Sequence, residues 1–110
     1  MAKGLMVVES SPQEGREGEF NDWYRNTHIP QILEVPGFLG ARRYRLSESA
    51  PQNQGSSKAR YLAIYELEAE DLAIPLEEMR TRSAAGRMER KPEVLSTDPP
   101  PVVTIYELID

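Results

Sequence analysis

FNDWYRNTHIPQILEVPGF, residues 20–38, is the stretch that decides the fold. Apolar side chains recur in it at three- and four-residue intervals, the pattern of an amphipathic helix, which we expect over residues 16–34. Pro30 removes one backbone donor and crowds the carbonyl one turn earlier, so it predicts a kink or a break immediately after His28. The helix should end just before Gly37, because glycine readily adopts a positive φ.

Short apolar runs on both sides of this helix predict strands. Residues 4–8 form a continuous apolar run, typical of a strand that is buried on both faces. Residues 60–67 alternate between two faces, with Tyr61, Ala63, Tyr65 and Leu67 on one of them. Further strands are expected over residues 38–46 and 102–109, a second helix over 70–85, and a polar, mobile hairpin connection over 47–59.

The order strand, helix, strand, strand, helix, strand is typical of one fold class. It predicts an α+β, ferredoxin-like βαββαβ domain, in which an antiparallel four-stranded sheet carries two helices on one face. The length of 110 residues fits a single domain over residues 1–110, because a second core would be too small to be stable alone.

Two helices can cover only one face of such a sheet, yet both faces of the predicted strands are apolar. Leu5 and Val7 oppose Met6 and Val8 in the first strand. Leaving several hundred Å² of apolar surface in water would cost on the order of 10 kcal/mol, comparable to the stability of a small domain. We therefore expect a homodimer with the two sheets face to face. The alternative is a monomer that closes this face with its own loop and tail, but residues 47–59 are too polar for that.

Composition excludes several classes of function. The net charge of -5 disfavours binding to nucleic acid, and we expect most of the arginines to be solvated. The absence of cysteine excludes disulfides and thiolate sites. The first apolar run is too short for a signal peptide or a membrane span, so no membrane association and a cytoplasmic location are expected.

His28 is the only histidine, and it shares a helical face with Tyr24. Imidazole titrates near neutrality, which makes His28 the candidate general acid or base. The alternative is that His28 donates to a backbone carbonyl and caps the kinked helix. A single histidine without further ligands does not predict a metal site. Trp23, next to Tyr24, is expected on a different packing surface.

Other polar side chains are candidates for substrate binding. Tyrosine hydroxyls on the strands can stabilise a carbonyl or enolate oxygen, and a guanidinium can pair with a carboxylate. Burial in the core or at an interface is the alternative for the tyrosines, and solvent exposure for the arginine. The candidates are Tyr24, Tyr44, Tyr65, Tyr106 and Arg43.

Residues 20–30, 35–38 and 42–45 closely resemble the EthD-like branch of the dimeric α/β-barrel superfamily. The resemblance implies a barrel formed by two sheets, a mostly apolar pocket between each sheet and its helices, and a position for His28 in or beside that pocket. The haem-degrading members carry an asparagine on the first strand and a histidine on the second helix. Both residues are missing here, and nucleotide-binding motifs are missing too, so no cofactor is expected.

Three functions agree with these observations. The first is a cofactor-free isomerase, cyclase or lyase that uses His28 on a small, partly apolar substrate. The second is a non-catalytic ligand-binding or accessory protein of a degradative or biosynthetic pathway. The third is a structural dimer with a vestigial pocket. A polar residue on the inner face of an aromatic helix favours the presence of a pocket.

Overall fold

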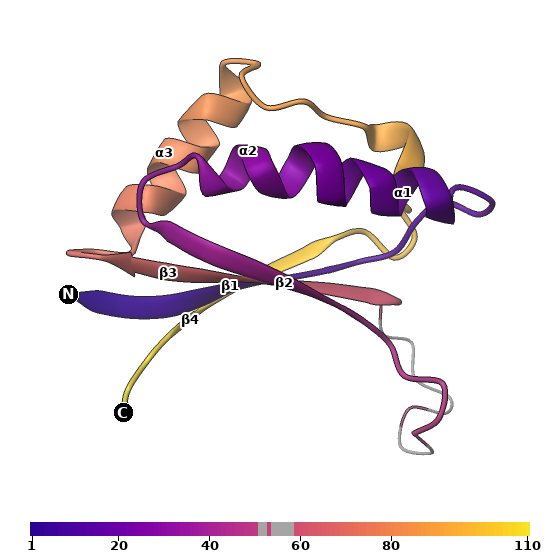
Figure 1. The fold of residues 1–110 in the computed structure, drawn as a ribbon, viewed down its shortest axis with the longest axis horizontal. Helices are drawn as coiled ribbons and strands as arrows, with labels where there is room; N and C mark the ends of the chain where they lie inside the picture. Colours follow the sequence, from indigo (N-terminus) through magenta and orange to yellow (C-terminus); the bar gives the residue numbers. More distant parts are fainter. Residues whose placement is uncertain (51–52, 54–58) are drawn as a thin grey trace.

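The structure is a computed structural model that describes residues 1–50, 53 and 59–110. Within these residues a four-stranded sheet carries the helices on one of its faces, as Figure 1 shows. The strands are β1 (Ala2–Ser10), β2 (Phe38–Arg45), β3 (Tyr61–Ala69) and β4 (Val102–Glu107). The helices are α1 (Glu17–Trp23), the π-helical η1 (Tyr24–His28), α2 (Ile29–Leu33), α3 (Ala73–Ala84) and the 3-10 helical η3 (Pro92–Val94).

The strand order is β2-β3-β1-β4, and every neighbouring pair is antiparallel. Each half of the chain contributes one central strand and one edge strand. This is the ferredoxin-like βαββαβ arrangement, so the α+β fold predicted from the order of elements is confirmed. α3 begins at Ala73 rather than near residue 70, because Pro75 is tolerated only close to the start of a helix.

The side chains of β3 alternate between the two faces of the sheet. Tyr61, Ala63, Tyr65 and Leu67 are buried against the helices, as their spacing predicted, and the side chains between them face the other way. The register places Met6 of β1 opposite Tyr65 and therefore in the same buried layer. The core lies between the helices and this layer of side chains.

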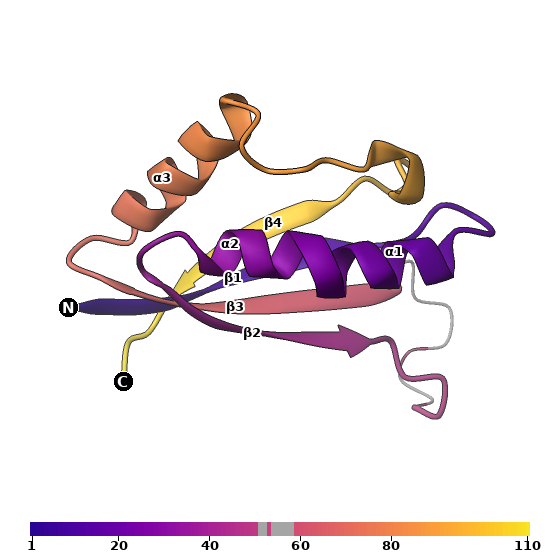
Figure 2. The ribbon, with the colours of Figure 1, turned by 45° about the horizontal axis from the view of Figure 1, so that its top comes forward.

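α1, η1 and α2 follow one another without a gap, and we call them together the long helix. This helix continues past Pro30 without a break (Figure 2). The preceding turn is widened instead: the N–H of Ile29 donates to the carbonyl of Tyr24, five residues earlier. A wider turn relieves the crowding between a proline ring and the carbonyl four residues before it. The predicted kink or break immediately after His28 is wrong: the helix continues there, and the disturbance is a π turn that precedes it, over Tyr24–His28. The long helix ends before Gly37, whose φ of 102° is positive as expected.

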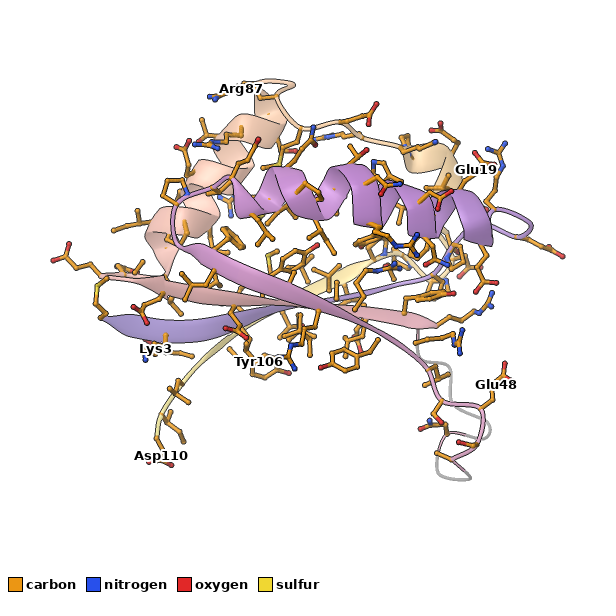
Figure 3. All side chains as sticks on the ribbon, viewed as in Figure 1. Lys3, Glu19, Glu48, Arg87, Tyr106 and Asp110 are labelled. Carbon is orange, nitrogen blue, oxygen red and sulfur yellow. The ribbon has the colours of Figure 1, made fainter. Side chains whose placement is uncertain are left out.

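The second face of the sheet carries apolar side chains that the described residues leave uncovered. Met6 and Val8 are buried, but Leu5 is exposed, so β1 is buried on one face and not on both as the sequence predicted. The cause is that both crossovers return on the same side. Figure 3 shows Tyr106 projecting away from the helices, with 57% of its surface exposed. We call this surface the open sheet face; its side chains include Leu5, Val7, Tyr44, Leu62, Ile64, Val102 and Tyr106.

The connection between α3 and β4 is long but anchored. The N–H of Gln13 donates to the carbonyl of Val94 at 2.8 Å, and the N–H of Ser96 donates to the carbonyl of Ser11 at 2.8 Å. These bonds hold residues 86–101 against the segment between β1 and α1, and the side chain of Val94 is fully buried. The connection therefore forms a fixed wall beside the helices.

The predicted hairpin connection over 47–59 lies largely outside the described residues, which leave out 51, 52 and 54–58. Its mobility stays a prediction. Among the helices of the described part, none is long and apolar enough to cross a membrane.

Candidate functional site

A cavity lies on the helix side of the sheet, between β1, β4, the long helix and α3. It consists of two adjoining hollows, one of about 380 Å³ beside α3 and one of about 280 Å³ beside Trp23. We call them together the His28 cavity, because His28 lines both. Their common wall consists of Val8, His28, Ser83, Met88 and Arg90. Most of the remaining lining is apolar, and it includes Met6, Ile32, Met79, Leu95 and Val103.

The imidazole of His28 contacts two aromatic rings of its own helix. Trp23 stacks on it with a centroid distance of 4.4 Å and an interplanar angle of 18°. Tyr24 meets it edge-on at 5.1 Å. The prediction that Trp23 lies on a different packing surface from Tyr24 and His28 was wrong. Trp23 stacks on His28 because the π turn brings residues that are five apart to the same side of the helix. Tyr24 and His28 lie together, as their shared helical face predicted.

Two ring nitrogens of this stack are buried without a hydrogen-bond partner among the described residues: Nδ1 of His28 and Nε1 of Trp23. Buried polar atoms in folded proteins nearly always have such a partner. Burial lowers the pKa of His28 to about 4, so the imidazole is neutral at pH 7. Both nitrogens are enclosed by neighbouring atoms, so Trp23 and His28 line the cavity through other atoms of their rings.

Arg90 and Ser83 meet where the two hollows adjoin. One guanidinium nitrogen of Arg90 donates to the hydroxyl of Ser83 at 2.9 Å. Within the described residues no carboxylate lies within ion-pair distance of Arg90. Arg80, which lines the hollow beside α3, is in contrast paired with Glu77 at 2.9 Å. In the described part of the chain, Arg90 is thus a cation of the cavity lining that no carboxylate compensates.

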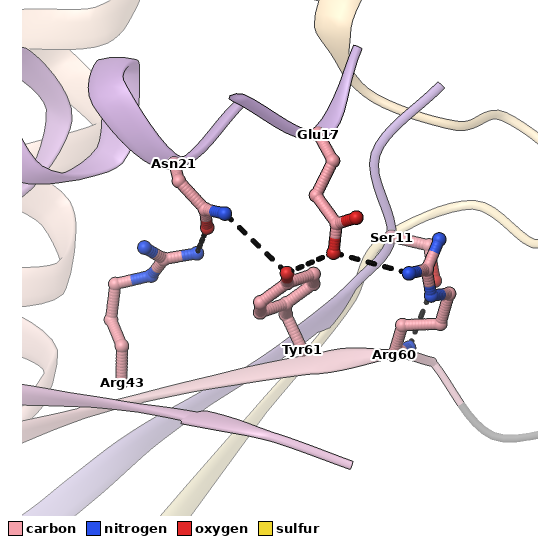
Figure 4. A network of polar contacts seen from close by, with 6 residues as sticks. All are labelled: Ser11, Glu17, Asn21, Arg43, Arg60 and Tyr61. Carbon is pink, nitrogen blue, oxygen red and sulfur yellow. Dashed lines mark hydrogen bonds and ion pairs between the residues drawn. The ribbon is translucent and has the colours of Figure 1, made fainter. Parts of the chain in front are cut away.

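A second polar group surrounds Arg43 at the other end of the long helix (Figure 4). Its guanidinium lies over the rings of Phe20, Tyr24 and Tyr61, at 5.5, 4.6 and 5.3 Å from their centroids. It donates to Oδ1 of Asn21 at 2.8 Å. The sequence predicted solvent exposure as the alternative to ligand binding for Arg43; its position in the alternating pattern of β2 instead turns it toward the helix, where it is half-buried.

Hydrogen bonds and an ion pair connect Asn21, the partner of Arg43, to Tyr61, Glu17 and Arg60. The amide of Asn21 donates to the hydroxyl of Tyr61 at 3.4 Å, and that hydroxyl donates to the carboxylate of Glu17. Arg60 pairs with the same carboxylate at 3.1 Å. The hydrogen bond from Tyr61 is the largest influence that lowers the pKa of Glu17. We call this group of five residues, Glu17, Asn21, Arg43, Arg60 and Tyr61, the Arg43 cluster. It does not line the His28 cavity.

The other predicted tyrosines lie in three different places. Tyr24 adjoins both regions; its hydroxyl lies 3.3 Å from Oγ of Ser10, and burial raises its pKa. Tyr65 is fully buried below the helix, its hydroxyl has no hydrogen-bond partner in the described part of the chain, and burial raises its pKa too. Tyr44 and Tyr106 lie on the open sheet face, away from the His28 cavity. Ligand contacts for these tyrosines and for Arg43 stay predictions.

Of the five residues in the common wall, only His28 was a sequence-based candidate. Met88 and Arg90 lie in the connection after α3, which has no periodic pattern. The only signal is Met88 itself, an isolated apolar residue in a charged stretch, which is buried in the structure. Ser83 lies in the last turn of α3. Among the described residues, no group of three or more histidine, cysteine, aspartate or glutamate side chains is placed to hold a metal ion.

Comparison with known proteins gives a family without an assigned function. A family model described as "Domain of unknown function (DUF4286)" matches residues 7–74, which is more than half of the chain. None of the curated proteins with which the chain was compared is a significant match.

Solved structures share the fold. An ethyl tert-butyl ether D (EthD) family protein from Bacillus halodurans is 23% identical over 99% of this chain and 100% of its own, with a TM-score of 0.59. A haem-degrading protein from Mycobacterium tuberculosis, solved with two haems bound in its active site, is 15% identical over 96% of this chain and 95% of its own, with a TM-score of 0.65. A dimeric ferredoxin-like protein of unknown function from Jannaschia is 21% identical over 96% of this chain and 99% of its own, with a TM-score of 0.57. The resemblance to EthD-like proteins is thus confirmed at the level of the fold.

Proposed function

The chain belongs to the DUF4286 family, and we propose that it binds a small, partly apolar organic molecule in the His28 cavity. The observation that carries the proposal is the His28 cavity itself, whose common wall brings His28 beside Ser83 and Arg90, an arginine with no paired carboxylate among the described residues. In a wall that is otherwise mostly apolar, these polar groups fix the orientation of a ligand, as the few polar groups of small-molecule sites generally do.

The protein works as a homodimer in this proposal. The open sheet face leaves Leu5, Val102 and Tyr106 exposed, and a hollow of about 490 Å³ lies beside Leu5 and Tyr106 on that face. A second copy packed on it through a symmetric contact would bury these side chains. The His28 cavity opens on the opposite side of the sheet and stays free in such a dimer. The neighbour from Jannaschia, described as dimeric, supports this arrangement.

Proton transfer by His28 is the second candidate, in an isomerase, cyclase or lyase without cofactor. The neutral, unpartnered imidazole favours it, because the ring is free to accept a proton. The pKa of about 4 opposes it, since so weak a base takes up protons poorly at neutral pH. Catalysis therefore requires a bound ligand that raises the pKa of His28. Binding without turnover requires nothing further, and the geometry favours it.

The proposal predicts that blocking the cavity abolishes binding. The single tryptophan gives one indole N–H signal in an NMR spectrum, and that signal reports on the hollow beside it. A library of small lactones, phenols and aromatic acids should contain compounds that shift it. Val103→Phe, which fills the hollow beside α3 from an exposed strand position, should weaken their binding at least ten-fold.

The matched control is Ile74→Phe, which adds the same ring at a position of α3 that is 57% exposed and lies outside the cavity and the open sheet face. It should bind as the unmodified protein does. Equal loss in both variants, or equal binding in both, would show that the compounds bind elsewhere.

A further inference from the structure

We propose that the occupant of the His28 cavity is an organic carboxylate, and that Arg90 binds its charged group. This inference rests on the proposed function and specifies the chemical class of the ligand. It follows from the distribution of charge around the cavity and from the hydrogen-bonding groups that meet there.

The lining of the hollow beside α3 is positive, although the whole chain carries a net charge of -5. Arg80 and Arg90 line it, and none of its lining residues is an aspartate or glutamate. The hollow beside Trp23 adds Lys91 and one acid, Glu89. Lys91 lies 4.0 Å from Glu19, so its charge is partly compensated. A cavity of this sign attracts anions in a protein whose overall field repels them.

Arg90 is the cation in this lining that has room for a ligand. Its contact with a side chain of the described residues is the hydroxyl of Ser83, a neutral group that occupies one guanidinium nitrogen. The remaining N–H groups form the planar fork that matches a carboxylate. Arg80 differs, because Glu77 already compensates its charge.

The groups around Arg90 are suited to an anion as well. Ser83 accepts the hydrogen bond from Arg90, so its own hydroxyl proton is available for a second acceptor. A ligand with carboxylate oxygens at one end and an apolar body at the other accepts hydrogen bonds from Arg90 and Ser83 and covers Val8 and Met88.

The test compares two probes of one shape and different charge, 2-naphthoate and 2-naphthamide. Binding is measured by titration, and its location by the NMR signals of the single histidine and the single tryptophan. We expect both probes to shift these signals and the carboxylate to bind about ten-fold more tightly, which corresponds to about 1.4 kcal/mol. Arg90→Gln should remove the ten-fold difference between the probes.

Arg87→Gln is the matched control, because Arg87 is an exposed arginine at the end of α3 that lines neither hollow (Figure 3). It should keep the ten-fold preference. If the two probes bind equally, or if the preference survives Arg90→Gln, the carboxylate proposal is overturned while binding in the cavity stands. If neither probe shifts the signals of His28 and Trp23, the carboxylate proposal and the proposed function both fail.

Discussion

Polar side chains at the two ends of the long helix differ in whether they have hydrogen-bond partners. In the Arg43 cluster every side chain has a partner: Arg43 donates to Asn21, Asn21 to Tyr61, and Tyr61 to Glu17. At the His28 end, two buried nitrogens have none among the described residues. A satisfied network stabilises the fold, whereas unpartnered buried groups cost free energy unless something else binds them. The comparison shows that the Arg43 cluster stabilises the fold, whereas the His28 end, where we propose that a ligand binds, carries buried groups without compensation from the described residues.

The largest expected difference between the two regions is the dependence of the free energy of unfolding on pH, which we expect at the His28 end. The folded state holds the pKa of His28 at about 4, below the ordinary 6.5, so the unfolded chain binds the proton first as the pH falls. The contribution of His28 to the free energy of unfolding is fully present above pH 6.5. It should decrease by about 3 kcal/mol between pH 6.5 and pH 4. Urea denaturation across this range measures it.

The control for this titration is His28→Phe, which keeps a stacked ring beside Trp23 without a titrating group. Its free energy of unfolding should depend less on pH between 6.5 and 5, where carboxylates contribute little. An equal slope in both proteins would mean that His28 is exposed to water and that its end of the helix is no different from the other.

Truncating Arg43 tests whether its cluster is structural. Arg43→Ala removes the hydrogen bond to Asn21 and the contacts with three aromatic rings, which we expect to lower the free energy of unfolding by about 2 kcal/mol. Arg25→Ala is the matched comparison, because Arg25 pairs with Asp22 in a largely exposed ion pair. It should cost no more than about 0.5 kcal/mol. Equal costs in the two variants would remove the structural role of the cluster.

Tyr65 lies between the two regions, and a variant of it tests to which region its hydroxyl belongs. Its hydroxyl is buried and has no partner among the residues that the structure describes, and Tyr24 and Arg43 lie near enough to influence its pKa. Tyr65→Phe removes a polar group that the fold does not use, so it should raise the free energy of unfolding by about 1 kcal/mol. A loss of stability instead would show that the hydroxyl belongs to the satisfied network. A loss of ligand affinity would place it with His28.

The sheet and the long helix could be predicted from sequence because their patterns are local. Alternation over residues 60–67 identified the buried face of β3, and the spacing of Tyr24 and His28 put both on one side of the helix. The form of the disturbance at Pro30 could not be predicted, since a helix can respond by a break, a kink or a wider turn. The stack of Trp23 on His28 depends on that response, and so it was missed.

The cavity wall and the place of Arg43 depend on contacts between distant residues. Residues 86–101 have no periodicity; bonds such as that between Gln13 and Val94 hold the segment in place. Nothing near Arg90 in the sequence indicates that it meets Ser83. Arg43 could be assigned to a face of its strand, but the rings that enclose it come from α1 and β3.

The stacked pair in the cavity also has an optical consequence. The chain contains one tryptophan and one histidine, and their rings lie 4.4 Å apart. Indole fluorescence is quenched more strongly by a protonated imidazole than by a neutral one at such a separation. The intrinsic emission of the protein is therefore a label-free reporter of the charge on His28, readable in a cuvette at concentrations far below those that NMR requires.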